Sequence, residues 1–221
     1  MDSLLLFSGG LDSVQVFAQR CMEGKETRLH HVQLKSWNRR HPYEKAAVNS
    51  ALSWARRNGY GSLFKYTESS FDYGDLKYIV RDHNVWSLFA GIILQDPKNA
   101  GITKVLRTFH RDSVIGGLES PAGQAAEIAW RGTVERVARR ELEFEYPQLH
   151  MTKAEIIAAM PPELVKACWY CRTPQGGRPC HKCHTCKAVD AALAGKPWIP
   201  LDERGGAVGD PAPGGADGSA R

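Results

Sequence analysis

The sequence has no hydrophobic run long enough to cross a lipid bilayer, which would take roughly 20 consecutive apolar residues. Its first residues also lack the basic region followed by a long apolar stretch that is typical of a secretory signal. These two absences exclude membrane-spanning and secreted proteins from our expectations. We therefore expect a cytoplasmic protein with no membrane partner.

Neither sign of charge is strongly in excess: the chain has 29 Lys and Arg residues against 24 Asp and Glu residues, a formal net charge of +5. A dedicated nucleic-acid-binding protein is expected to carry a clustered basic stripe, and this surplus falls short of one. No internal repeat is evident, and 221 residues suit one domain, or one domain with a small appendage.

Cysteine is scarce outside one short segment. Five of the six cysteines lie between Cys168 and Cys186, and Cys21 stands alone on an expected helix, where we expect a small buried side chain. In a chain without a secretory signal, this clustering favours a metal site over a disulfide framework.

Short apolar strands alternate with helical patterns along most of the chain. We expect strands over 3–7, 30–34, 63–66 and 104–107, and helices from about 11 to 21 and over 43–57, 84–94, 122–141 and 152–160. The last helix has Thr152 as its N-cap and Glu155 three positions on, which is the capping-box arrangement. The alternation predicts an α/β fold, a parallel twisted sheet with helices on both faces.

The first strand leads into Ser8-Gly9-Gly10-Leu11-Asp12-Ser13 before a helix begins. Such a turn gathers free backbone N–H groups and the positive end of the helix dipole, and its glycines let an anion approach the backbone closely. The alternative is a plain strand-to-helix turn capped by Ser and Asp. We interpret the segment as a phosphate site formed by Phe7, Ser8, Gly9, Gly10, Leu11, Asp12 and Ser13.

Asp12 is the unusual member of this segment, because a carboxylate next to a phosphate repels it unless a cation lies between them. We therefore infer magnesium and assign Asp12 a catalytic role in positioning magnesium or pyrophosphate. The segment matches neither G-x-x-x-x-G-K-S/T nor G-x-G-x-x-G, so the common NTPase loop and a dinucleotide-binding site are not supported.

A second motif lies near the C-terminus, where Cys171, Cys180, Cys183 and Cys186 follow one another at steps of nine, three and three. Four thiolates at this spacing favour a structural zinc site with no open coordination position, and an iron–sulfur cluster is the nearest alternative. Cys168 could replace one ligand, whereas His181 and His184 are expected to face solvent. We predict a small zinc-bound segment appended to the sheet domain.

The hexapeptide resembles the PP-loop of ATP pyrophosphatases, which cleave ATP to AMP and pyrophosphate to activate a substrate oxygen as an adenylate. With the cysteine motif in place, the chain resembles the 7-cyano-7-deazaguanine synthase family, the PP-loop enzymes of queuosine precursor synthesis. This resemblance spans roughly residues 3 to 195. It is carried by residues 151–157, by Trp169-Tyr170-Cys171 with the cysteine steps, and by Arg39-Arg40-His41 after the second strand.

The resemblance implies an ATP-dependent carbon–nitrogen ligase that forms AMP and pyrophosphate, with ATP, magnesium and zinc as cofactors. Its small-molecule substrates would be the deazapurine acid 7-carboxy-7-deazaguanine and ammonia. Nucleic acid would be a partner only downstream of the product. Family members often self-associate, which implies a homodimer.

Two segments depart from the family pattern. His83-Asn84 stands where the family carries Arg-Asn, and residues 108–119 replace an acidic loop that is expected to line the base pocket. The candidate substrate-contacting residues are Arg39, His41, His83, Asn84 and His110.

We expect a nucleotide-binding domain over residues 1–150 and a helical, zinc-binding segment over 151–203. A disordered tail is expected over 204–221, because its Gly, Ala, Pro and Asp residues leave almost nothing to bury. Two other functions stay open. One is a PP-loop enzyme that adenylates a different carboxylate, an amide or a nucleic-acid base. The other is a nucleic-acid-binding module that is stabilised by a structural zinc ion.

Overall fold

A single parallel sheet forms the centre of the molecule in the computed structural model, which describes residues 1–76, 82–113 and 117–195. The spatial order of its strands is β3-β2-β1-β4-β5, and each neighbouring pair is parallel. The strands are β1 (Ser3–Leu6), β2 (Thr27–Lys35), β3 (Phe64–Asp72), β4 (Lys104–Leu106) and β5 (Glu143–Glu145). The predicted α/β class with a parallel sheet is confirmed.

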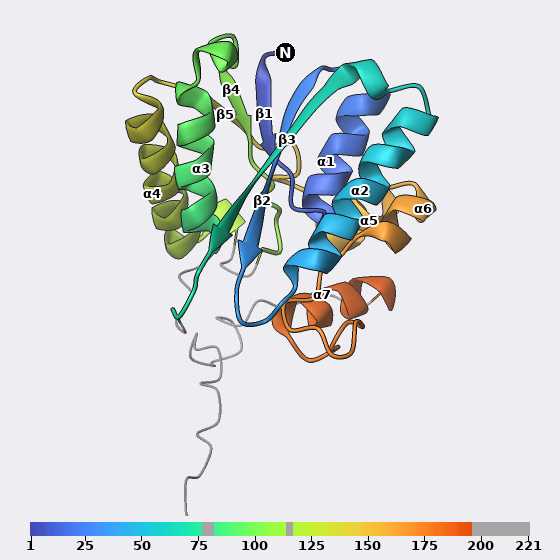
Figure 1. The fold of residues 1–221 in the computed structure, drawn as a ribbon. Helices are drawn as coiled ribbons and strands as arrows, with labels where there is room; N and C mark the ends of the chain where they lie inside the picture. Colours follow the sequence, from blue (N-terminus) through green and yellow to red (C-terminus); the bar gives the residue numbers. More distant parts are fainter. Residues whose placement is uncertain (77–81, 114–116, 196–221) are drawn as a thin grey trace, which may run out of the picture.

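Helices cover both faces of the sheet, as predicted. One face carries α1 and α2, the other carries α3 and α4, and the short helices α5 to α7 lie beside α1 and α2 (Figure 1). The helices are α1 (Leu11–Met22), α2 (His41–Arg57), α3 (Asp82–Gln95), α4 (Pro121–Ala138), α5 (Lys153–Ala158), α6 (Pro162–Ala167) and α7 (His184–Leu193). Among the described residues, none of these helices combines the length and apolarity that crossing a membrane would require.

The two largest hydrophobic clusters lie on opposite faces of the sheet, because side chains alternate in direction along the strands. On β1, Leu5 packs with Phe17 of α1 in one core, while its neighbour Leu4 packs with Trp130 of α4 in the other. The Cys21 side chain is buried in the first core, as the sequence predicts.

Several element boundaries differ from the sequence-based expectation. Strands β2 and β3 are nine residues each, because polar residues such as Thr67 and Ser69 continue the pairing after the apolar run ends. Strand β5 and helices α6 and α7 were not expected, since three to ten residues carry too little periodicity to be recognised. Helix α5 has the predicted Thr152–Glu155 capping box but ends at Ala158. The expected tail over 204–221, and residues 196–203 before it, lie outside the described residues.

The strand order reverses direction next to β1. From β1 the chain adds β2 and β3 on one side, and it then returns to add β4 and β5 on the other. Ligands of open α/β sheets bind outside the carboxyl ends of the strands at such a switch point. The glycine-rich turn after β1 therefore starts at the position that the topology favours for a ligand.

Close packing between α3 and α4 gives a matched pair of glycine substitutions. A Cβ on Gly91 would lie 2.5 Å from the Val137 Cβ, whereas one on Gly132 meets no heavy atom within 4 Å. We expect Gly91→Ala to lower the free energy of unfolding by about 1–3 kcal/mol through overpacking. Gly132→Ala should raise it by about 0.5–1 kcal/mol, because alanine is the better helix former. Urea unfolding followed by circular dichroism measures both, and equal effects would contradict the packing.

Acid should destabilise the fold through His30, because burial, with a further contribution from the nearby His31, lowers the pKa of His30 to about 4. Between the ordinary value of 6.5 and that value, the unfolded chain binds a proton that the folded chain does not. The free energy of unfolding is therefore highest above pH 6.5, and it falls by up to about 3 kcal/mol as the pH decreases from 6.5 to about 4. Urea unfolding at pH 7 and pH 4.5 should show a smaller loss in His30→Gln than in the wild type, and an unchanged loss in the exposed control His150→Gln.

Candidate functional site

The glycine-rich turn is held in shape by its own hydroxyl groups. The hydroxyl oxygens of Ser8 and Ser13 lie 3.0 Å apart, and the backbone N–H of Gly10 donates to Ser8 Oγ at 3.2 Å. The Ser13 hydroxyl in turn donates to the Gly10 carbonyl at 3.2 Å. These bonds order the turn before any ligand binds.

Gly9 is required where two other segments approach the turn. Its φ is +77°, and a Cβ there would lie 2.7 Å from the Glu44 carbonyl oxygen of α2. From the C-terminal segment, the backbone N–H of Trp169 donates to the Gly9 carbonyl at 3.0 Å. A side chain at position 9 would be strained in backbone conformation and would collide with α2.

The turn opens onto a cleft. Ser8, Gly10, Leu11 and Asp12 line it on one side, and α2, α3 and the C-terminal segment supply the other walls. Phe7 packs in the core with its side chain buried, and Ser13 is also buried, so these two support the turn from beneath. Four of the seven residues predicted to form the phosphate site thus line a cavity.

Asp12 already has a cationic partner within the protein. Lys153 Nζ forms an ion pair with Asp12 Oδ1, and His110 Nε2 lies 3.9 Å from Asp12 Oδ2. Burial tends to raise the pKa of Asp12, but the charges of Lys153 and His110 outweigh it and lower this pKa, so the carboxylate is ionised. Lys153, which the sequence argument did not single out, is thus a cationic partner of Asp12 in addition to the magnesium that the argument inferred.

Lys153 is itself fixed by Asp112, which follows His110 in the segment after β4. Asp112 accepts hydrogen bonds from the Lys153 backbone N–H at 2.9 and 3.1 Å and from His110 Nδ1 at 2.8 Å. The Lys153 side chain is only 7% exposed. The glycine-rich turn and residues 108–113 therefore meet at Asp12 through His110 and Lys153.

A second charged cluster stands on another wall of the cleft. Arg40, which is buried, contacts Asp82 Oδ2 at 2.5 Å through Nη2 and Glu44 Oε1 at 3.1 Å through Nε. Burial raises the pKa of Glu44, and the positive charge of Arg40 offsets part of this increase. Arg172 Nη1 lies 3.9 Å from Asp82 Oδ2. Three cations, Arg40, Lys153 and Arg172, thus line the cleft with three carboxylates, Asp12, Glu44 and Asp82.

Of the five candidate substrate residues, only His110 reaches the turn. Arg39 is exposed at a left-handed position with φ of +50°, and its neighbour Arg40 lines the cleft instead. His41 begins α2 and is partly buried, while His83 and Asn84 lie in the first turn of α3; none of these three is among the residues found to line the cleft. Arg40 could have been suggested by its place in the Arg39-Arg40-His41 segment, but only the fold shows which arginine points inward.

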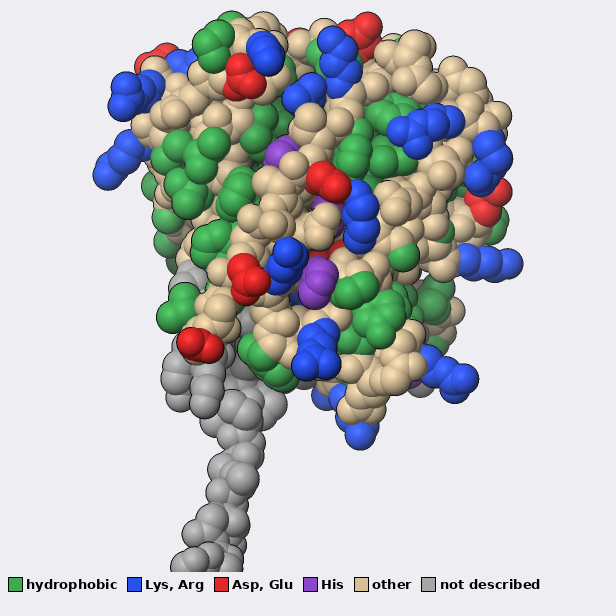
Figure 2. All heavy atoms as spheres, viewed as in Figure 1, with side chains coloured by type: hydrophobic (Ala, Val, Ile, Leu, Met, Phe, Trp, Pro, Cys, Tyr) green, Lys and Arg blue, Asp and Glu red, His purple; other side chains and the backbone are tan. Residues whose placement is uncertain are grey.

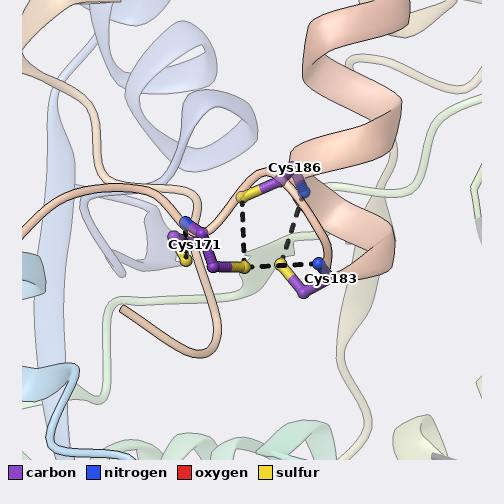
Figure 3. Close-up of side chains that lie close together, drawn as sticks. Cys171, Cys183 and Cys186 are labelled. Carbon is purple, nitrogen blue, oxygen red and sulfur yellow. Dashed lines mark hydrogen bonds between the residues drawn. The ribbon is translucent and has the colours of Figure 1, made fainter. Parts of the chain in front are cut away.

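The four motif cysteines come together as predicted. Their sulfurs all lie within 4.8 Å of one another and could hold a metal ion, and Figure 3 shows the side chains of Cys171, Cys183 and Cys186 close together. Burial opposes ionisation of Cys180, but bonds from the Thr173 hydroxyl and the Cys183 and Lys182 N–H groups lower its pKa to about 6. A thiolate supported by N–H donors is the form that binds a metal.

The cysteine group does not include the other candidate ligands. Cys168 is buried, and burial raises the pKa of its thiol to about 12. The exposed His181 pairs with Asp190 at 2.9 Å. His184 begins α7 and is partly buried rather than facing solvent.

The cysteine group is joined to the glycine-rich turn through one residue. The Trp169 indole N–H donates to the Cys171 carbonyl at 2.8 Å, and its ring stacks on Tyr43 of α2 at 4.5 Å between centroids. Because the Trp169 backbone also bonds to Gly9, the cysteine group and the turn share a support.

Comparison with solved structures places this arrangement among known folds. The fold is shared with an NMN synthetase. The structure of that enzyme from Francisella tularensis superposes with a TM-score of 0.51 at 13% sequence identity, covering 89% of this chain and 78% of the synthetase. A U34-tRNA thiolase, NcsA from Methanococcus maripaludis with its 4Fe–4S cluster, matches with a TM-score of 0.48 at 13% identity, covering 86% and 63%. No family model matches the chain, and no curated protein does.

Loss of one cysteine ligand should remove the metal. We expect Cys183→Ser to lose most of the bound metal and to unfold at a lower temperature, because three ligands close the site poorly. Cys168→Ala, a change at the buried cysteine outside the group, should keep the full metal content. Elemental analysis and thermal denaturation test this, and equal metal content in both variants would contradict the ligand assignment.

Proposed function

We propose that this protein is an ATP-dependent ligase that converts 7-carboxy-7-deazaguanine and ammonia to 7-cyano-7-deazaguanine, with release of AMP and pyrophosphate. The observation that carries the proposal is the Ser8–Ser13 turn, ordered by its own hydrogen bonds and open to a cleft at the switch point of the sheet. The likeness to NMN synthetase supports the fold alone. The choice of substrate rests on the sequence resemblance of residues 151–157 and of the Trp169 to Cys186 segment.

The turn suits the triphosphate of a nucleotide. Helix α1 begins at Leu11 in the wall of the cleft, so the positive end of its dipole would lie near the negative charge that develops on the departing pyrophosphate. Groups that are fixed beforehand stabilise such charge most effectively. The six charged side chains of the cleft sum to zero, so they leave a triphosphate unneutralised. Magnesium fits this deficit, and Asp12 offers it a carboxylate oxygen; when bound, it would offset phosphate charge and orient the leaving group.

The reaction would proceed through two adenylations. The 7-carboxylate attacks the α-phosphorus of ATP, which gives an acyl adenylate and releases pyrophosphate. Ammonia then displaces AMP with loss of a proton and leaves the amide. A second ATP adenylates the amide oxygen, which releases pyrophosphate and a proton and leaves an imidoyl adenylate. Loss of AMP and a second proton from this adenylate forms the nitrile.

We propose zinc for the cysteine group. Four thiolates at about 2.3 Å around one tetrahedral ion stand about 3.8 Å apart. The Cys180 and Cys186 sulfurs lie 3.9 Å apart, and the whole group lies within 4.8 Å. An iron–sulfur cube binds each thiolate to a different iron, which spreads the sulfurs farther apart. Four protein ligands leave no position for water, so the role of this zinc is structural.

The proposal includes small-molecule partners and no direct nucleic-acid contact. On the face in Figure 2, Lys and Arg side chains are scattered among Asp and Glu and form no continuous stripe. The expected homodimer stays a prediction.

Pyrophosphate release tests the function directly. The protein with ATP and magnesium should release pyrophosphate only when 7-carboxy-7-deazaguanine is present, and mass spectrometry should find the nitrile once ammonium is added. Gly9→Ala should reduce the rate of release by about tenfold or more. Its Cβ would push the turn and α2 apart, and such overpacking costs about 1–3 kcal/mol. A rise of about 1.4 kcal/mol in the activation free energy is enough for a tenfold slower reaction. Gly132→Ala, in open space on α4, should retain wild-type release. Turnover with another acid, or none at all, would overturn the substrate assignment.

A further inference from the structure

The ammonium of Lys153 stands inside the cleft, next to the turn. Lys153 lines the cleft together with Ser8, Gly10 and Asp12, and Asp12 Oδ1 is its ion-pair partner. Burying an ammonium costs free energy unless hydrogen-bond acceptors replace the lost water. The ammonium of Lys153 has three N–H groups to donate, so it can bind further acceptors besides Asp12.

The same ion pair limits what Asp12 can do in the free protein. One of its oxygens is held by Lys153, and the other faces the His110 ring at 3.9 Å. A carboxylate whose charge is offset by an ammonium attracts a divalent cation weakly. Asp12 can therefore serve magnesium only after Lys153 has found another anion.

We propose that Lys153 is a phosphate-binding residue whose ammonium moves from Asp12 to an oxygen of the bound pyrophosphate group, leaving Asp12 free for the divalent cation. This inference rests on the proposed function and names the residue that exchanges partners. Both partners of the exchange line one cleft, so the ammonium needs only rotation of its flexible side chain.

The backbone of Lys153 is anchored so that only its side chain needs to move. Asp112 holds the Lys153 N–H, and the Thr152–Glu155 capping box fixes the first turn of α5. His110 and Asp112 are thereby positioning residues, since they act on the ligand through Lys153 and Asp12.

Pyrophosphate itself is the probe for this exchange. Isothermal titration of the full-length protein with inorganic pyrophosphate and magnesium should show binding that Lys153→Met weakens by about tenfold to a hundredfold, the usual range for a lost charged hydrogen bond. Lys153→Arg should recover part of the affinity, because it keeps the charge. Lys166→Met, the same change at an exposed lysine on α6, should bind pyrophosphate as the wild type does.

A second measurement separates ligand binding from a merely structural role. Electron paramagnetic resonance of Mn²⁺ with ligand-free protein should show tighter Mn²⁺ binding in Lys153→Met than in the wild type, because Asp12 is released, and no change in Lys166→Met. Wild-type pyrophosphate affinity in Lys153→Met would overturn the inference, as would unchanged Mn²⁺ binding in that variant.

The inference and the proposed function fail separately. If the wild type binds pyrophosphate and Lys153→Met does not, yet no turnover occurs with 7-carboxy-7-deazaguanine, the role of Lys153 stands and the substrate assignment falls. If the wild type binds no pyrophosphate, both fall.

Discussion

The contact between the backbone of Gly9 and its neighbours constrains the rest of the site. Helix α2 approaches position 9 too closely for any side chain, and the Trp169 backbone bonds to the Gly9 carbonyl from the opposite end of the chain. The turn is thereby held in place beside the cleft, and residues from three separate parts of the sequence meet there. Without this close approach, α2 could not place Arg40 and Glu44 on the cleft wall.

The C-terminal segment extends this constraint to the cysteine group. Trp169 bonds to Cys171 through its indole and stacks on Tyr43, so the position of the segment depends on the cysteines that surround it. A segment of this size buries little apolar surface, and a bound ion would contribute much of its folding free energy. Cys171 itself lines the cleft, so a metal held by the cysteines would affect this site directly as well as through the shared support at Gly9.

Electrostatics within the cleft are balanced rather than cationic. Each inward cation is matched by a carboxylate, which keeps buried charges paired in the absence of a ligand. Such pairs are stable at rest, yet each can exchange one partner for an anion of similar geometry. This balance accounts for a cleft rich in charged side chains that adds little to the net charge of the chain.

Local patterns were sufficient for the α/β class, the strand-to-helix turn, the capping box at Thr152 and the cysteine set, because each depends on residues close together in the sequence. They did not reveal β5, α6 or α7, whose few residues carry little periodicity. They also favoured Arg39 over Arg40, since the two are equivalent until a positive φ turns one outward. The pairing of Lys153 with Asp12 joins residues 141 positions apart. No spacing rule encodes such a contact, and only the packing of α5 against α1, together with the loop carrying His110 and Asp112, decided it.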